Sequence, residues 1–127
     1  MRRLSLFILG TVLMLSGCGG GEKKAESHLD PNTDAGRGEQ VFKTHCAACH
    51  AVKGDRVVVG PSLAGVAKRA ATRVEGLAAE DYLRESIIYP NDYTVEGFAE
   101  GAMQQNFATQ LTSDEVNYLV AYLMTLK

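Results

Sequence analysis

The segment Cys46-Ala47-Ala48-Cys49-His50 constrains this chain more than any other part of its sequence. Two cysteines three residues apart lie on one side of a helical turn, so both thiols can add to the two vinyl groups of one porphyrin. His50 follows directly and lies under the ring centre, where an imidazole can ligate iron. The Cys-x-x-Cys-His pattern is the signature of covalent haem attachment. It predicts one haem c, bound covalently through Cys46 and Cys49, with His50 as an axial ligand of the iron.

Two other roles for these cysteines are weaker alternatives. A thioredoxin-like thiol pair belongs in a βαβ unit, but the single β-prone run, residues 57–59, is too short to build a sheet. A structural zinc site needs four ligands. The remaining histidines are His28, in a polar segment, and His45, in the same helix as the cysteines. A zinc or dithiol domain is therefore the least favoured interpretation.

The N-terminus has the pattern of an export signal. Residues 1–3 are Met-Arg-Arg, and the apolar run that follows, residues 4–15, contains no charge. This run is shorter than the roughly 20 residues that span a bilayer. The next residues, Leu15-Ser16-Gly17-Cys18, resemble the bacterial lipobox, in which the cysteine is acylated and becomes the mature N-terminus. We expect a cleaved signal peptide over residues 1–17 and a lipid on Cys18; an ordinary cleaved signal is the alternative.

The rest of the chain divides into a tether and one compact domain. Residues 18–33 begin glycine-rich and continue with mixed charge, which predicts a lipid-anchored flexible tether. Residues 34–127 form the predicted domain. The whole chain has 13 basic and 15 acidic residues, and removing Arg2 and Arg3 with the signal makes the balance more acidic. Nucleic acid is therefore not an expected partner, because binding it requires clustered positive charge.

The compact domain is expected to be all-α. Asp34 is the predicted N-cap of a helix over residues 35–47. A second helix is expected over residues 79–88, and a third follows the capping-box sequence of residues 112–115 and ends at Lys127. Three modest helices bury little apolar surface, and the irregular stretch at 90–111 is long for a bare domain. Both features indicate a large bound group that the polypeptide wraps.

Met103 is the predicted second axial ligand. Once the signal is removed, only Met103 and Met124 remain, and Met124 lies in the last turns of the C-terminal helix, where core packing is expected. Met103 lies in the irregular stretch, and a loop can bring a thioether to the far side of a haem. Thioether ligation favours ferrous iron and raises the reduction potential. The alternative is a Met103 that only packs on the haem edge.

The domain resembles the class I c-type cytochromes over residues 34–127. Gly38 and Phe42 precede Cys46 by eight and four residues, as in that family, where they pack on the C-terminal helix, here residues 119–123. The resemblance implies a small cytochrome c fold with three to five helices wrapped around one covalently bound haem.

Two loops carry the same resemblance. Gly60-Pro61-Ser62-Leu63 matches the family's Gly-Pro-x-Leu loop, which implies that the carbonyl of Pro61 accepts the Nδ1 proton of His50. The residues around Met103 are similar to the family's methionine loop. That family usually has proline directly after the ligand, whereas this chain has Gln104.

Together, these features predict a membrane-tethered monohaem electron carrier in a respiratory or related electron-transfer chain, and not an enzyme in its own right. It is expected to be exported and to face the periplasm or the cell exterior. Residues 82–91 resemble the cytochrome domains of haem–copper oxidases, so such an oxidase or a quinol-oxidising complex is a candidate partner among its redox donors and acceptors. No lysine-rich docking ring is present, so an apolar patch at the haem edge, including Ala47 and Ala48, is expected to dock partners. The alternative function is a five-coordinate haem sensor or a peroxidase-like protein, which requires Met103 to be off the iron.

Overall fold

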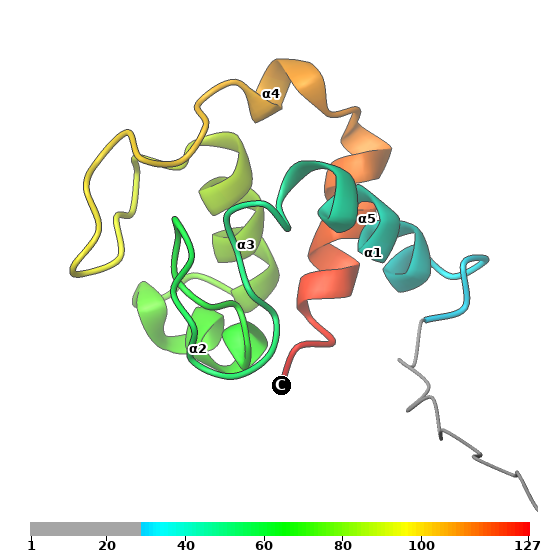
Figure 1. The fold of residues 1–127 in the computed structure, drawn as a ribbon, viewed down its shortest axis with the longest axis horizontal. Helices are drawn as coiled ribbons and strands as arrows, with labels where there is room; N and C mark the ends of the chain where they lie inside the picture. Colours follow the sequence, from blue (N-terminus) through cyan, green and yellow to red (C-terminus); the bar gives the residue numbers. More distant parts are fainter. Residues whose placement is uncertain (1–28) are drawn as a thin grey trace, which may run out of the picture.

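A computed structural model describes residues 29–127, and these form five α-helices and no strand (Figure 1). The expectation of a small all-α fold is confirmed. The predicted signal peptide, Cys18, His28 and most of the predicted tether lie outside the described residues. The helices are α1 (Asp34–His45), α2 (Val66–Arg73), α3 (Ala79–Ile88), α4 (Phe107–Gln110) and α5 (Ser113–Leu123).

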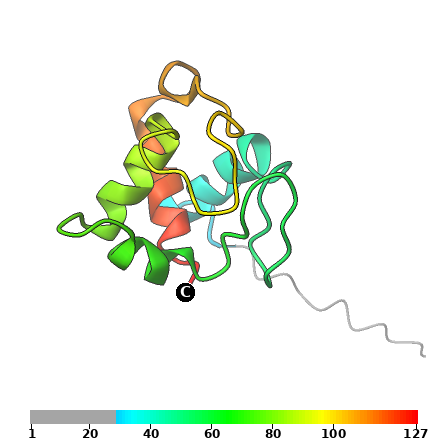
Figure 2. The same ribbon diagram turned by 90° about the vertical axis from the view of Figure 1, so that its left-hand side faces the viewer.

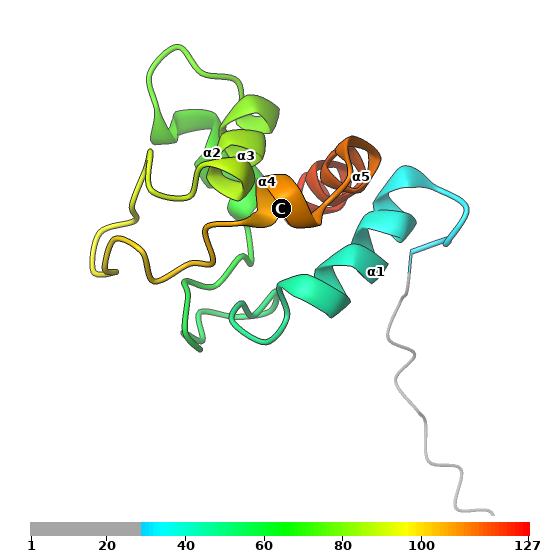
Figure 3. The ribbon, with the colours of Figure 1, turned by 90° about the horizontal axis from the view of Figure 1, so that it is seen from above.

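Helices α1 and α5 make the most extensive helix–helix contact among the described residues; Figure 1 shows them side by side, and Figure 3 shows both from above. Gly38 makes this approach possible, because a Cβ atom there would lie 1.8 Å from the carbonyl oxygen of Tyr118. One turn later, the ring of Phe42 lies 5.3 Å from the ring of Tyr122, centroid to centroid. The predicted packing of Gly38 and Phe42 on the C-terminal helix is therefore present.

The start of α1 differs from the sequence prediction. Thr33, not Asp34, is the N-cap: its hydroxyl oxygen accepts a hydrogen bond from the amide of Gly36 at 3.1 Å. The same hydroxyl donates to the carbonyl of Asp30 at 2.7 Å. Threonine and aspartate are both good caps, and here the extended backbone of Thr33 decides between them. Asp34 instead occupies the first turn, where its charge suits the positive end of the helix dipole.

Residues just before α1 also contact the domain. The amide of Leu29 donates to Oε2 of Glu39 at 3.2 Å, and the Leu29 side chain packs against the core. Gly36 accommodates this segment, since a Cβ atom there would lie 1.9 Å from the carbonyl oxygen of Asp30. Among the described residues, contacts with the helices thus extend back to Leu29, five residues before the boundary expected at residue 34.

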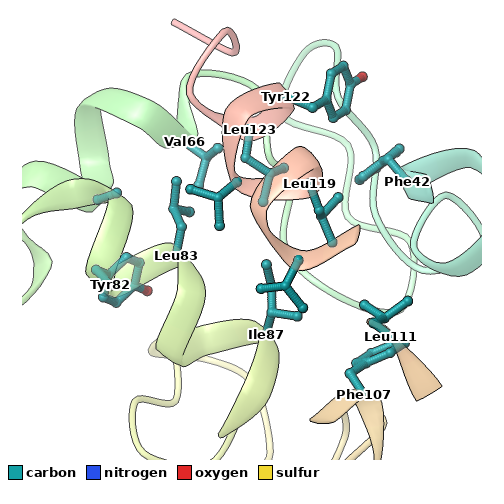
Figure 4. Close-up of a cluster of buried hydrophobic side chains, with 13 residues drawn as sticks. Phe42, Val66, Tyr82, Leu83, Ile87, Phe107, Leu111, Leu119, Tyr122 and Leu123 are labelled. Carbon is teal, nitrogen blue, oxygen red and sulfur yellow. The ribbon is translucent and has the colours of Figure 1, made fainter. Parts of the chain in front are cut away.

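The hydrophobic core surrounds α5, with α1 on one side and α3 on the other (Figure 4). Leu119 of α5 is the most completely buried large side chain, with 1% of its surface exposed. Helix α2 closes the core from one side with Val66, Ala67 and Ala70 and was not predicted from the sequence. Its eight residues carry only this small apolar face, begin without a side-chain cap and are too few for a clear helical period.

Helix α5 begins with the predicted capping box. The amide of Glu115 donates to the hydroxyl of Thr112 at 3.2 Å, and the amide of Thr112 donates to the Glu115 carboxylate at 2.8 Å. The hydrogen bond from the Thr112 backbone, with a smaller contribution from its hydroxyl, lowers the pKa of Glu115. The helix ends at Leu123 and not at Lys127, because the last residues form turns, and Leu126 accepts the amide of Ala67 in α2.

A long loop, residues 89–106, joins α3 to α4. It lies, in yellow, across the face of the molecule that Figure 2 turns toward the viewer. The expected irregular stretch at 90–111 is therefore mostly correct, but it contains the single helical turn of α4. No helix in the described part of the chain combines the length and apolarity needed to cross a bilayer.

Candidate haem site

One large cavity opens at the end of α1, between helices α2, α3 and α5. Two loops, residues 46–65 and 89–106, complete its walls. The sequence-predicted haem residues within residues 29–127 all line this cavity, although they come from three separate segments. They are Cys46, Cys49, His50, Pro61 and Met103.

The two cysteines lie on a tight turn that continues directly from α1. Cys46 follows the last residue of α1, and its amide donates to the carbonyl of Phe42 at 2.8 Å. The amides of Cys49 and His50 both donate to the carbonyl of Cys46, each at 3.0 Å. Neither cysteine is in a disulfide, and Cys49 is exposed at the cavity rim while Cys46 is half-buried. The turn thus presents two free thiols to one cavity.

The electrostatic surroundings of these thiols disfavour a dithiol oxidoreductase. Burial, with a smaller contribution from the nearby Cys49, raises the pKa of the Cys46 thiol to about 11. Redox-active thiol pairs instead need a lowered pKa, because the thiolate is the nucleophile. Among residues 29–127, no three histidine, cysteine, aspartate or glutamate side chains are arranged to hold a metal ion, which gives a zinc site no support.

The His50 ring is held in one orientation by its neighbours. Its Nδ1 lies 2.8 Å from the carbonyl oxygen of Pro61. A carbonyl oxygen only accepts hydrogen bonds, so Nδ1 carries the proton and Nε2 keeps the lone pair that a metal needs. Gly60 leaves room for this ring, because a Cβ atom there would lie 2.4 Å from Cε1 of His50. The Gly60 amide also donates to the carbonyl of Cys49 at 2.9 Å, which joins the loop that contains Pro61 to the turn that carries the two cysteines.

Arg69 of α2 supports the Pro61 segment and was missed in the sequence. Its guanidinium donates to the carbonyl of Ser62 at 2.8 Å and to that of Ala64 at 2.5 Å. These bonds fix the backbone directly after Pro61, whose carbonyl lies next to His50. A basic residue in a short helix gives no sequence signal for this role.

The two methionines have different surroundings. Met103 is half-buried and lines the cavity from the 89–106 loop. Met124 is also half-buried, and both methionines pack against the hydrophobic core, but Met124 does not line the cavity. Only Met103 therefore shares a cavity with the imidazole of His50.

The residues that line the cavity fit a haem in their chemistry. Aliphatic and aromatic side chains of the core line much of it, as suits a large apolar macrocycle. Two thiols supply the points of covalent attachment. An imidazole that carries its proton on Nδ1 and a thioether supply two ligand types found on haem iron. Ser86 of α3 adds a hydroxyl whose oxygen is buried and, within the described chain, has no hydrogen-bond partner. Such a group is expected where part of a site is filled by something other than protein.

Comparison with known proteins agrees with this geometry. Residues 35–127 match the family model described as "Cytochrome c". A cytochrome c of Gibberella zeae is 32% identical over 97 residues, which cover 71% of this chain and 92% of that protein. Cytochrome c2 iso-2 of Magnetospirillum molischianum is 31% identical over 90 residues (66% and 93%), and cytochrome c2 of Rhodoblastus acidophilus is 35% identical over 80 residues (62% and 74%).

The fold and the cavity define a small monohaem protein, and the chain belongs to the cytochrome c family. Like other members, it binds haem c covalently and transfers electrons, and it is not an enzyme.

Proposed function

We propose that this chain is a membrane-tethered, one-haem carrier that moves single electrons within a respiratory or related chain. Membership of the cytochrome c family supplies the electron-transfer role. The observation that most supports a carrier with two axial ligands is that His50 and Met103, from two different segments, line the same cavity as both cysteines. The proposed tether rests on the lipobox-like sequence that ends at Cys18.

The cysteines would attach the cofactor in a reaction that needs no oxidant or reductant. Each thiol, of Cys46 and of Cys49, would add across one vinyl group, forming a carbon–sulfur bond while its hydrogen moves to the neighbouring carbon. No oxidant is needed, and the two thioether links would keep the cofactor at the end of α1. When bound, the haem supplies a one-electron ferric/ferrous couple.

The axial residues would set the properties of that couple. His50 would ligate through Nε2, since its Nδ1 proton is committed to the Pro61 carbonyl at 2.8 Å. Met103 would occupy the opposite position with a soft thioether, which favours the reduced state. With both in place, small molecules are kept from the iron and little rearrangement accompanies electron transfer. The alternative, a five-coordinate sensor or peroxidase-like protein, requires Met103 to stay away from the iron.

Docking to redox partners would use the surface around Cys49, at the rim of the cavity. Ala47, Ala48 and Cys49 are exposed there, as an apolar docking patch requires. The adjacent residues 57–59 are three exposed valines that the sequence analysis did not assign to docking. Val59 lines the cavity itself, so the exposed valines are continuous with its rim. An apolar face of this kind suits partners that do not depend on strong charge steering; a haem–copper oxidase or a quinol-oxidising complex is the partner class we propose.

The lipid anchor on Cys18 would hold the domain close to such partners. An extended chain of the 11 residues from 18 to 28 reaches at most about 40 Å, so the domain would stay near the outer face of the membrane. It would not diffuse away between the protein that reduces it and the protein that oxidises it.

A Cys18→Ser variant tests the tether and the carrier role together. In membranes from cells that mature c-type cytochromes, a respiratory donor should reduce the wild-type haem and oxygen should reoxidise it. The variant should appear in the soluble fraction with its haem intact, and its rate of reduction by the same membranes should rise with its concentration. The control is the wild type solubilised in detergent, which should behave like the variant.

Two results would contradict the proposal. Persistence of Cys18→Ser in washed membranes would exclude acylation of Cys18 as the anchor. A wild-type haem that no respiratory donor reduces in intact membranes would exclude the proposed chain.

A further inference from the structure

The backbone directly after Met103 is held by side-chain amides. Gln104 donates both hydrogens of its amide nitrogen, to Oδ1 of Asn106 at 2.7 Å and to Oε1 of Gln110 at 2.6 Å. Gln110 is the last residue of α4, and Asn106 is its N-cap position. One side chain therefore joins the residue after Met103 to both ends of α4.

Two further contacts brace the same segment. The Gln105 side-chain amide donates to the carbonyl of Met103 at 2.6 Å. Before Met103, the amide of Gly101 donates to Oδ1 of Asn91 at 2.9 Å, which ties the returning part of the loop to its beginning. Met103 thus lies between two fixed points in a loop that otherwise has no regular structure.

Helix α4 is itself fixed to the core, so it can serve as the support. Phe107, its first residue, is 5% exposed and belongs to the core cluster together with Leu111, which follows the helix. The amide of Gln110 donates to the carbonyl of Asn106 at 3.1 Å. A side chain bonded to both Asn106 and Gln110 is therefore anchored to a rigid part of the domain.

We propose that Gln104 is a positioning residue that holds the Met103 thioether at the haem iron by clamping the loop to α4. The inference rests on the proposed function, because it requires Met103 to be an axial ligand. A loop without this clamp would spend more time with the thioether away from the iron. The apparent affinity of a competing ligand rises in proportion to the fraction of molecules in which the thioether is away from the iron.

The decisive experiment compares ferric wild type with Gln104→Leu, which removes both donors and introduces no group that could bind the iron. Exogenous imidazole competes with the thioether for iron, and its apparent association constant should rise about threefold to tenfold in the variant, as expected for the loss of one or two ordinary hydrogen bonds. The weak red absorption band of the thioether–iron bond should be weaker in the variant than in wild type. Gln40→Leu, which replaces an exposed glutamine on α1, is the matched control and should leave both readouts unchanged.

A double-mutant cycle with Gln110→Leu separates the clamp from a general loss of stability. If the pair acts as a unit, the effects of Gln104→Leu and Gln110→Leu on imidazole affinity should be clearly less than additive in the double variant. A Gln104→Leu protein with a lower unfolding midpoint but unchanged imidazole affinity would overturn the proposal and leave only a structural role. Wild type without the thioether band would overturn both this inference and the proposed ligation, whereas a normal wild-type band with an unaffected variant would overturn the clamp alone.

Discussion

In a Met103→Ala variant, we expect the ferric protein to lose the thioether–iron band, become high-spin and bind imidazole about a hundredfold more tightly than wild type. The size follows if the wild-type thioether occupies the iron about 99% of the time, since removing it frees a site that is otherwise open in about 1% of molecules. Optical titration of both proteins with imidazole measures the change.

Met124→Ala is the matched control for this prediction. Met124 packs on the core and does not line the cavity, so its loss should leave the spectrum and the imidazole affinity unchanged. It should instead lower the free energy of unfolding, by about 1–3 kcal/mol for a half-buried side chain. A wild-type protein that is already high-spin, or a Met103→Ala variant that keeps the thioether band, would contradict the assignment of Met103.

The second large effect is expected from Gly38→Ala. The new Cβ atom would lie 1.8 Å from the carbonyl oxygen of Tyr118 and 2.8 Å from Cβ of Tyr122, so α1 and α5 must move apart. Alanine alone would favour the helix by up to about 1 kcal/mol over glycine. We expect the clash to outweigh this gain and to lower the free energy of unfolding by about 2–4 kcal/mol, since overpacking a rigid core is costly.

Chemical denaturation of the haem-loaded protein measures this loss. Gln40→Ala in the same helix is the control, because its exposed side chain meets no such obstacle and its stability should change by less than about 0.5 kcal/mol. If Gly38→Ala were as stable as wild type, the close approach of α1 to α5 would not be needed for the fold.

The sequence predicted best where one residue type is required by geometry. Gly38 and Phe42 were assigned to the helix contact from the family resemblance, and the structure has this contact, which only glycine permits at position 38. The capping box before α5 was equally recognisable, because both of its bonds are local. Cys46, Cys49 and His50 belong to one motif with fixed spacing, and the structure places Pro61 and Met103 at the same cavity.

The features that were missed depend on contacts between distant segments. Helix α2 is stabilised by burial of a small apolar face against the core, which eight residues of sequence do not reveal. Arg69 acts through two carbonyls that only the folded loop brings near. Asp34 was predicted as the N-cap in place of Thr33 because the two residue types have similar capping preferences. The backbone conformation that makes Thr33 the N-cap is not visible in the local sequence.

The most direct test of the central claim is a potentiometric titration of the purified protein, followed by its absorption spectrum. We expect one covalently attached haem per chain, a single reversible one-electron transition, and a low-spin ferric spectrum with the band of a thioether–iron bond. A high-spin ferric spectrum, or a haem that does not cycle reversibly between the two states, would contradict an electron carrier with His50 and Met103 on the iron.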